Sequence, residues 1–126
     1  MNENKTEKLL KIISKLRNPS SGCEWTKSQT SKSLLPFILE ETKEIQEAFE
    51  NNDYENFKEE LGDLLLQIVL QSKIAEENKL FSFDEVIDTL CEKLIRRHPY
   101  VFNEKRPHTL EEQREAYFRI KDLEKS

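Results

Sequence analysis

The stretch that decides the fold runs from Leu34 to Ala48, with the sequence LLPFILEETKEIQEA. At about 100° per residue, a helix over this stretch carries an apolar stripe on one face. The members of the stripe are Leu34, Phe37, Ile38, Ile45 and Ala48. Glu41 falls in the middle of the stripe, Glu44 at its edge and Glu40 on its flank. Because an ionised carboxylate on a core face is costly without a compensating positive charge, this pattern is either a misplaced charge or a cation site.

A second segment supplies matching acids. Glu60 and Asp63 begin it, and the apolar run LLLQIVL at 64–70 follows with almost no polar face. A helix that is apolar nearly all round is a buried helix, and residues three apart on a helix point the same way. Glu41 and Glu44 have the same spacing. Two adjacent helices that each present such a pair converge four carboxylates, which suits a hard divalent cation such as Mg²⁺.

Acidic pairs on helices are also common on solvated faces, and 36% of this chain is charged. We expect Glu76-Glu77 and Glu111-Glu112 to be ordinary pairs of that kind. The first four acids differ from them because they lie next to strongly apolar runs. Their position therefore favours a cation site over a solvated face.

The acids also form a motif that resembles a known family. Glu40-Glu41-x-x-Glu44, then fifteen residues, then Glu60-x-x-Asp63 is similar to the EExxE…ExxD signature of the MazG family. Upstream, LRNPSSGCEWTKSQTSKSL at 16–34 resembles the family leader LRxPxxGCPWDxxQTxxSL. Downstream, KLIRRHPYVF at 93–102 resembles KLxRRHPHVF. Glu24, Thr26 and Tyr100 stand where the family usually has Pro, Asp and His, so the substrate preference stays open.

The resemblance implies an all-α nucleoside triphosphate pyrophosphohydrolase. It implies that one or more Mg²⁺ ions, with Mn²⁺ as a possible substitute, are held by Glu41, Glu44, Glu60 and Asp63. The expected reaction cleaves a nucleoside triphosphate between the α and β phosphates, giving the monophosphate and pyrophosphate. Glu40 and Glu41 are the candidate catalytic residues. Glu40 lies just beside the helix positions of the expected metal ligands and would orient or deprotonate the attacking water. Its alternative role is that of a further metal ligand.

The leader block contributes two candidate substrate-binding residues. The resemblance implies that its loop walls the nucleotide pocket, with Trp25 and Gln29 as contacts. The alternative for Trp25, the only tryptophan, is that it caps the hydrophobic core.

The other substrate-binding candidates lie in the last third of the chain. Lys93, Arg96 and Arg97 crowd the end of a helix, where cations also complement the helix dipole. Within a family-like block we favour phosphate contact for at least one of them, because the planar fork of arginine binds two phosphate oxygens. Tyr117 and Lys121 are weaker candidates for a nucleotide-facing lid. Their alternative is a docked amphipathic tail.

Periodicity and capping residues predict five helices and no strand. The expected helices run from about 5 to 16, from 31–33 to about 50, from the Asn51-Asn52-Asp53 connection to about 77, from the capping box at Ser82 to a point before Pro99, and from the capping box at Thr109 to about 125. The fold class is therefore all-α, a bundle of about four to five helices whose core is completed by oligomerisation. We expect one MazG-like domain over residues 1–126, with 104–126 as a helical tail, in a homodimer or homotetramer. Trp25 is expected in a polar loop between the first two helices.

Two of these helices are expected to bury an apolar side. The members are Leu9, Leu10, Ile12, Ile13 and Leu16 in the first helix and Val86, Ile87, Leu90, Cys91 and Leu94 in the fourth. Gly62, inside the third helix, is expected to mark a close backbone approach or room for a ligand.

Composition excludes several function classes. The net charge is −5, from 20 basic and 25 acidic residues, which gives no electrostatic footprint for nucleic acid. No apolar run approaches a membrane span. Two glycines are too few for a P-loop or a GxGxxG turn. Cys23 and Cys91 lack CxxC spacing, which favours free thiols and a cytoplasmic location.

Two further metal sites and one non-catalytic role compete with this interpretation. A di-iron carboxylate bundle needs Glu-x-x-His pairs, and neither His98 nor His108 has a Glu three residues before it. An EF-hand needs an acidic loop centred on glycine, which is absent from the sequence. A helical interaction module without catalysis stays possible, although it does not explain Glu41 in the apolar stripe. The sequence leaves open the base, the sugar and the number of metals.

Overall fold

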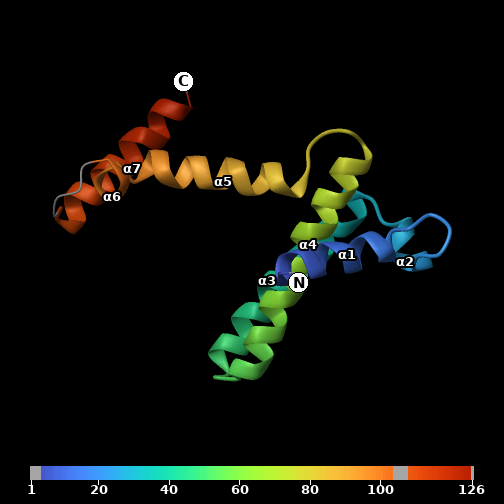
Figure 1. Cartoon of the computed structure of the whole chain (residues 1–126). Coiled ribbons are helices and arrows are strands. Elements are labelled where there is room, and N and C mark those ends of the chain that lie inside the picture. The colour runs from blue at the N-terminus through green and yellow to red at the C-terminus, as the bar shows by residue number, and fades with distance from the viewer. Residues whose placement is uncertain (1–3, 104–107, 126) are drawn as a thin grey trace. The chain divides into compact units, whose positions relative to one another are not determined.

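The computed structural model describes residues 4–103 and 108–125, and within these ranges it contains helices and no strand (Figure 1). The helices are α1 (Lys5–Leu16), α2 (Glu24–Ser28), α3 (Ser31–Glu50), α4 (Tyr54–Glu77), α5 (Phe83–Arg97), α6 (Pro99–Phe102) and α7 (Leu110–Glu124). The all-α class is confirmed, and the five longer helices follow the predicted spans. Across the described residues, no helix has the length and apolar character that a membrane crossing requires.

Side chains at the helix starts explain why the boundaries were readable. At the start of α1, the Asn4 side-chain oxygen accepts a hydrogen bond from the Glu7 N–H at 2.8 Å. At the start of α4, the Asp53 carboxylate accepts one from the Asn56 N–H at 3.2 Å. The capping box predicted at Thr109 is present. The Thr109 hydroxyl accepts a hydrogen bond from the Glu112 N–H, and the Glu112 carboxylate accepts one from the Thr109 N–H. Such caps satisfy donors that a helix start leaves free.

The contacts of the chain divide it into two compact units, one ending at Phe83 and the other beginning at Asp84. We describe each unit by itself. The assignment of a single domain over residues 1–126 stays a prediction.

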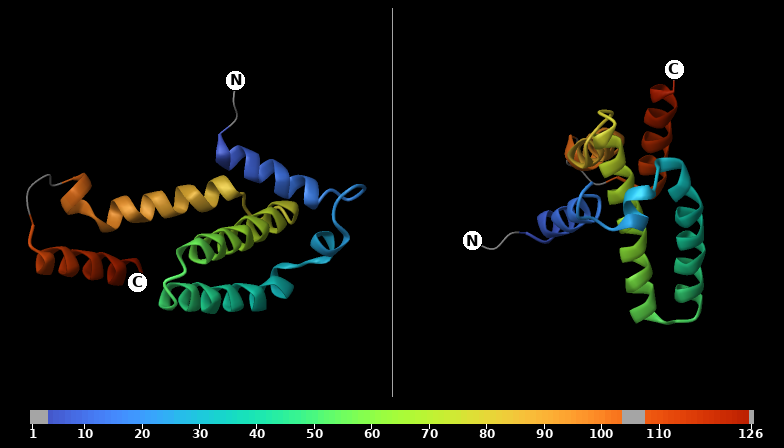
Figure 2. Two further views of the ribbon diagram at one scale, coloured as in Figure 1. Left: turned by 90° about the horizontal axis from the view of Figure 1, so that it is seen from below. Right: turned by 90° about the vertical axis from the view of Figure 1, so that its right-hand side faces the viewer.

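Helices α3 and α4 form the antiparallel pair on which the first unit is built (Figure 2). Their connection is only Asn51–Asp53, in which Asn52 has a φ of 56°. Asparagine adopts this left-handed conformation more readily than most residues. Near the connection, the Asp53 N–H donates to the Ala48 carbonyl at 3.1 Å. At the other end, Gln71 Nε2 donates to the Ser31 carbonyl at 2.9 Å, so the register is fixed at both ends.

The core of this unit lies where α1 meets the α3–α4 pair. Its buried members are Ile13, Leu34, Val69, Leu70 and Ile74, with Leu9, Leu10 and Leu16 packed against them. Two expectations were wrong at the edges of the stripes, because Ile12 and Phe37 are exposed to 46% and 38%. Ile12 lies on the outer side of α1, and Phe37 instead meets the Trp25 ring.

The polar loop expected around Trp25 is a short helix, α2, so that prediction was wrong. Five residues are too few to hold a helix by their own propensity, and no side chain caps its start. Arg17, at the end of α1, stabilises it from outside. Its Nη1 donates to the carbonyls of Thr26 and Gln29 at 2.7 and 2.9 Å, at the end of α2 where carbonyls lack helical partners.

Arg17 also connects α2 to α4 by hydrogen bonds. Its Nη2 and Nε donate to the two carboxylate oxygens of Glu77 at 2.5 and 3.2 Å, and its side chain is only 9% exposed. The hydrogen bond from Arg17 lowers the pKa of Glu77 below its usual range. One side chain thus joins three helices of the first unit.

In the second unit, the described residues of α5 include no buried one. The prediction that Val86, Ile87, Leu90, Cys91 and Leu94 form a buried side was therefore wrong for the single chain. Contact between α5 and α7 comes from the last turn of α5: Arg96 and Arg97 both pair with Glu124, and Arg97 Nη2 lies 2.7 Å from Glu124 Oε1. These contacts leave the apolar side of α5 open.

We expect the contribution of Glu124 to stability to depend on pH. Hydrogen bonds from Arg96 and Arg97 lower the pKa of Glu124 to about 2, below that of an unfolded glutamate. A depressed folded pKa gives stability that is present above about pH 4.5 and lost as the pH falls toward 2. The free energy of unfolding, measured with urea and circular dichroism, should therefore differ between wild type and Glu124→Gln at pH 6 and converge near pH 2.

The matched control is Glu115→Gln, an exposed glutamate in the middle of the same helix. The ion-pair assignment would be contradicted if the difference in free energy of unfolding between wild type and Glu124→Gln stayed constant from pH 6 to pH 2.

Candidate metal centre

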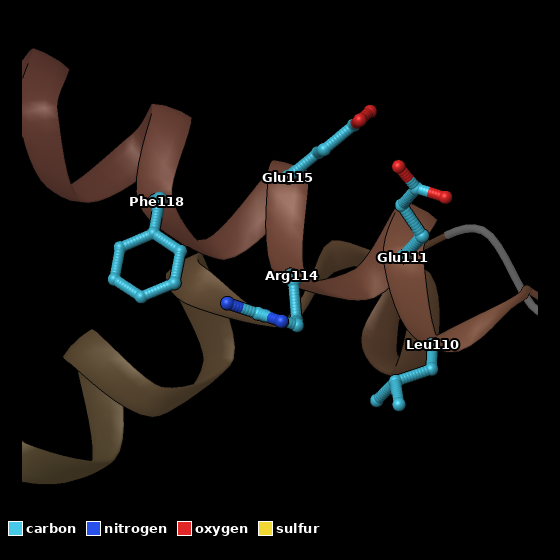
Figure 3. Close-up of a pocket in the computed structure, with 5 residues that line it drawn as sticks. All are labelled: Leu110, Glu111, Arg114, Glu115 and Phe118. Carbon is cyan, nitrogen blue, oxygen red and sulfur yellow. The ribbon is translucent and has the colours of Figure 1, made fainter.

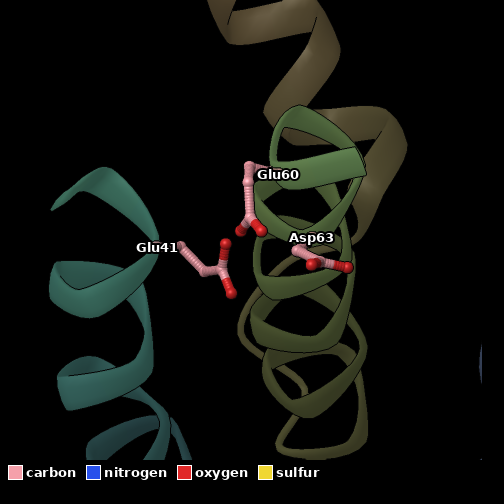
Figure 4. Close-up of side chains that lie close together, drawn as sticks. All are labelled: Glu41, Glu60 and Asp63. Atoms are coloured by element: carbon pink, nitrogen blue, oxygen red, sulfur yellow. The ribbon is translucent and has the colours of Figure 1, made fainter. Parts of the chain in front are cut away.

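Three carboxylates meet between α3 and α4. Glu41 projects from α3 toward α4, and Glu60 and Asp63 project from successive turns of α4 (Figure 4). One ligand oxygen from each lies within 4.8 Å of the others. The antiparallel register brings these side chains together from positions about twenty residues apart.

Two of these side chains carry buried oxygens with nothing to bind. Glu41 Oε2 and Glu60 Oε2 are inaccessible to solvent and have no hydrogen-bond partner among the described residues. A buried acceptor without a partner costs about 1–3 kcal/mol, and more when it is charged. An all-oxygen carboxylate set with unsatisfied, inward-facing atoms matches the preference of Mg²⁺ and Mn²⁺. These residues therefore fit a divalent cation.

The electrostatics of the cluster point the same way. The pKa of Glu41 is raised, first by burial of its carboxyl group and then by the charges of Glu44 and Asp63. The pKa of Glu60 is raised mainly through its hydrogen bond with Glu41. Like charges at this spacing favour a shared proton unless a cation compensates them. A divalent cation would replace that proton.

The remaining two predicted acids lie beside the three. Glu44, half-buried one turn after Glu41, has a pKa raised through hydrogen bonding with Glu60 and through the negative charge of that group. It belongs to the same cluster, although its oxygens lie outside the closest three. Glu40 is exposed at the adjacent position of α3. That placement leaves it accessible to solvent water.

Gly62 lies between Glu60 and Asp63 on α4. A Cβ atom added there would meet no described atom within 4 Å. A glycine inside a helix costs about 1 kcal/mol relative to alanine, so its presence needs a reason. Of the two reasons that the sequence suggests, a close backbone approach within the chain is excluded for the described residues, and room for a ligand stays a prediction.

Trp25 and Gln29 are held near α3 by local contacts. The Trp25 ring meets the edge of Phe37, with ring centroids 5.6 Å apart and planes at 79°. Phe37 lies one helical turn before Glu41. Trp25 is 51% exposed, so it does not cap the core. Gln29 Oε1 accepts the Ser33 hydroxyl at 2.7 Å, which uses part of its amide in the structure of the leader.

Arg17 is the residue of the leader that the sequence reasoning missed. Its contacts, described above, fix the α2 segment that carries Trp25. The signal was present in the Leu16-Arg17 dipeptide of the family-like leader, but the spacing of an arginine does not reveal which carbonyls it will bind.

The second unit holds the remaining predicted substrate-binding residues. Arg96 and Arg97 are occupied by Glu124, and the Arg97 guanidinium also lies 5.5 Å from the centre of the Tyr117 ring. Its Nη1 donates to the Tyr117 hydroxyl at 3.3 Å. Lys93 and Lys121 are half-buried on α5 and α7. The approach of these five residues to the carboxylates stays a prediction.

A pocket of about 620 Å³ lies along α7 (Figure 3). Its lining consists of Leu110, Glu111, Arg114, Glu115 and Phe118. All five come from one helix, and none of them belongs to the carboxylate cluster or to the predicted nucleotide contacts.

Comparison with known proteins supports the resemblance seen in the motifs. Residues 29–102 match the MazG nucleotide pyrophosphohydrolase domain. The nucleoside triphosphate pyrophosphohydrolase/pyrophosphatase MazG of Thermotoga maritima is 50% identical over 98 residues, which are 78% of this chain and 38% of that protein. The nucleoside triphosphate pyrophosphohydrolase of Escherichia coli K12 is 41% identical over 99 residues, 79% of this chain and 38% of that protein. The chain thus spans well under half the length of these relatives.

A solved structure extends the similarity to the fold. The crystal structure of a mazG-related protein from Thermotoga maritima superposes with a TM-score of 0.77 at 31% identity, covering 92% of this chain and 98% of that one. The residues matched by the family, 29–102, include Glu40 and the four acids of the α3–α4 cluster. They also include Lys93, Arg96 and Arg97. Together with the motifs and the helical pair that carries them, these matches place the chain in the MazG nucleotide pyrophosphohydrolase family.

Proposed function

We propose that this chain hydrolyses nucleoside triphosphates to the monophosphate and pyrophosphate with the help of Mg²⁺. The observation that carries the proposal is the meeting of Glu41, Glu60 and Asp63 within 4.8 Å, with two buried oxygens that lack partners. Membership of the family and the names of the relatives support the substrate class.

In this proposal the three carboxylates and Glu44 hold the ion against the triphosphate. When bound, Mg²⁺ neutralises phosphate oxygens and makes a nearby water more acidic. Water opens the anhydride bridge between the α and β phosphorus atoms, and its oxygen ends on one of the two products. The exposed carboxylate of Glu40 accepts a proton from that water, which requires hydrogen-bond reach in the substrate complex.

Basic side chains of the second unit would stabilise the leaving pyrophosphate. Lys93, Arg96 and Arg97 offer charge-assisted donors for the negative charge that builds on it. Glu124 binds Arg96 through Nε and Arg97 through Nε and Nη2, so it competes with phosphate most strongly for Arg97. Trp25, held against Phe37 one turn before Glu41, forms a wall for the nucleotide.

We also infer that the chain associates with a second copy of itself. Leu61, Leu65 and Ile68 form a strip along α4 and are each 41–46% exposed. Such a strip on a helix that is apolar nearly all round is expected to be covered. The open space beside Gly62 adjoins it in sequence.

Self-association predicts a molar mass in solution of at least twice 15.0 kDa. The Leu65→Lys variant, which places a charge in the strip, should lower the mass toward that of one chain. Light scattering after gel filtration measures both. A wild type that elutes with the mass of a single chain at micromolar concentration would contradict the inference.

The reaction itself is tested on a panel of ribo- and deoxynucleoside triphosphates with Mg²⁺ and with EDTA, resolving pyrophosphate from orthophosphate. We expect pyrophosphate release that requires Mg²⁺. Glu41→Gln should lower kcat/KM at least about 100-fold, because even outer partners of metal sites cost about 10–100-fold when removed. Glu59→Gln, next to Glu60 but exposed on α4, is the matched control and should retain activity.

Release of orthophosphate would show that the bond assignment is wrong. Absence of turnover, together with a Glu41→Gln variant that is more stable than wild type, would favour the non-catalytic interaction module instead.

A further inference from the structure

Gln67 is a buried amide that the proposed reaction does not yet use. The residue is 7% exposed, and its Oε1 has no hydrogen-bond partner within the described part of the chain. Buried acceptors in native proteins are nearly always paired with protein groups or ordered water. The Gln67 oxygen therefore needs a donor other than the described residues, such as ordered water or a bound group.

The position of Gln67 on α4 shows which way its side chain faces. Glu60, Asp63, Gln67 and Gln71 follow one another at intervals of three or four residues, so they share one face of the helix. This face turns toward α3 at both ends: Glu60 and Asp63 meet Glu41 there, and Gln71 bonds the Ser31 carbonyl. Gln67 lies between these contacts and faces α3 as well.

The neighbours of Gln67 along this face change from apolar to acidic. On one side lie Gln71, whose Nε2 already donates to the Ser31 carbonyl, and the core residues Leu34, Leu70 and Ile74, which offer no hydrogen-bond donor. On the other side lie Glu41 and Glu60, each with its own buried oxygen that lacks a partner. A row of unpaired acceptors on neighbouring turns disfavours an anion as the missing group. A cation, or a water molecule bound to a cation, would supply what these acceptors lack.

We propose that Gln67 is a positioning residue of the metal centre, whose Oε1 accepts a hydrogen bond from a water molecule of the hydrated cation held by Glu41, Glu60 and Asp63. The proposal rests on the proposed function, since it requires the cation. Mg²⁺ in proteins usually keeps several of its waters, and outer partners of a metal orient its ligands. The amide accepts such a hydrogen bond without adding charge to a cluster that is already strongly negative.

The test measures Mn²⁺ binding by calorimetry without nucleotide, together with thermal unfolding in EDTA, for wild type, Gln67→Met and the control Gln46→Met. Methionine is of similar length but cannot accept the hydrogen bond. We expect Gln67→Met to weaken Mn²⁺ binding about 10–100-fold. Its unfolding midpoint in EDTA should equal or exceed that of wild type, because an unpaired buried acceptor is gone. Gln46→Met, at an exposed position of α3 where the amide bonds only locally to Glu50, should retain wild-type Mn²⁺ affinity.

Several results would overturn the proposal. Equal Mn²⁺ affinity in Gln67→Met and wild type would remove Gln67 from the metal centre while leaving the centre intact. A lower unfolding midpoint in EDTA would show that the amide supports the α3–α4 packing instead. Weaker binding of nucleotide alone would assign the donor to the nucleotide. Absence of Mn²⁺ binding to wild type would remove the centre and the proposed function together.

Discussion

The antiparallel contact of α3 with α4 is the constraint on which the rest of the structure depends. Its register is fixed near the connection by the Asp53–Ala48 backbone bond and at the far end by Gln71 and Ser31. With the register fixed in this way, Glu41 lies opposite Glu60 and Asp63. Two helices that pack through an apolar stripe thereby bring carboxyl groups together at a partly buried position, where like charges repel one another unless a proton or a cation compensates them.

Other parts of the first unit are attached to this pair. α1 packs on it through Ile13, and Arg17 joins the ends of α1, α2 and α4 with one largely buried guanidinium. Because α2 is held in this way, Trp25 reaches Phe37 on the helix that carries Glu41. The leader block and the acidic motif, separate in sequence, thus form one structural region. In the second unit, Glu124 holds the two arginines that the proposed reaction needs.

The sequence predicted what local chemistry decides. Capping residues and Pro99 set the helix ends within a residue or two, and the spacing of Glu41, Glu60 and Asp63 indicated that they would meet. What it could not supply depends on contacts across long separations: Arg17 with Glu77 is 60 residues apart, and Arg97 with Glu124 is 27. For the same reason α2 was expected as a loop. A buried side was wrongly assigned to α5, because an apolar stripe predicts burial without saying whether the covering surface belongs to the same chain.

The most direct measurement is a crystal structure of the chain grown with Mn²⁺, with diffraction data collected to record the anomalous signal of manganese. The account predicts one or more anomalous peaks between the carboxylates of Glu41, Glu60 and Asp63, with oxygen atoms at about 2.0–2.2 Å, close to the distances that Mg²⁺ adopts. No peak there at saturating Mn²⁺, with the carboxyl groups hydrogen-bonded to one another, would contradict it. The acids of the α3–α4 pair would then be structural, and the chain would lack the centre on which its proposed chemistry rests.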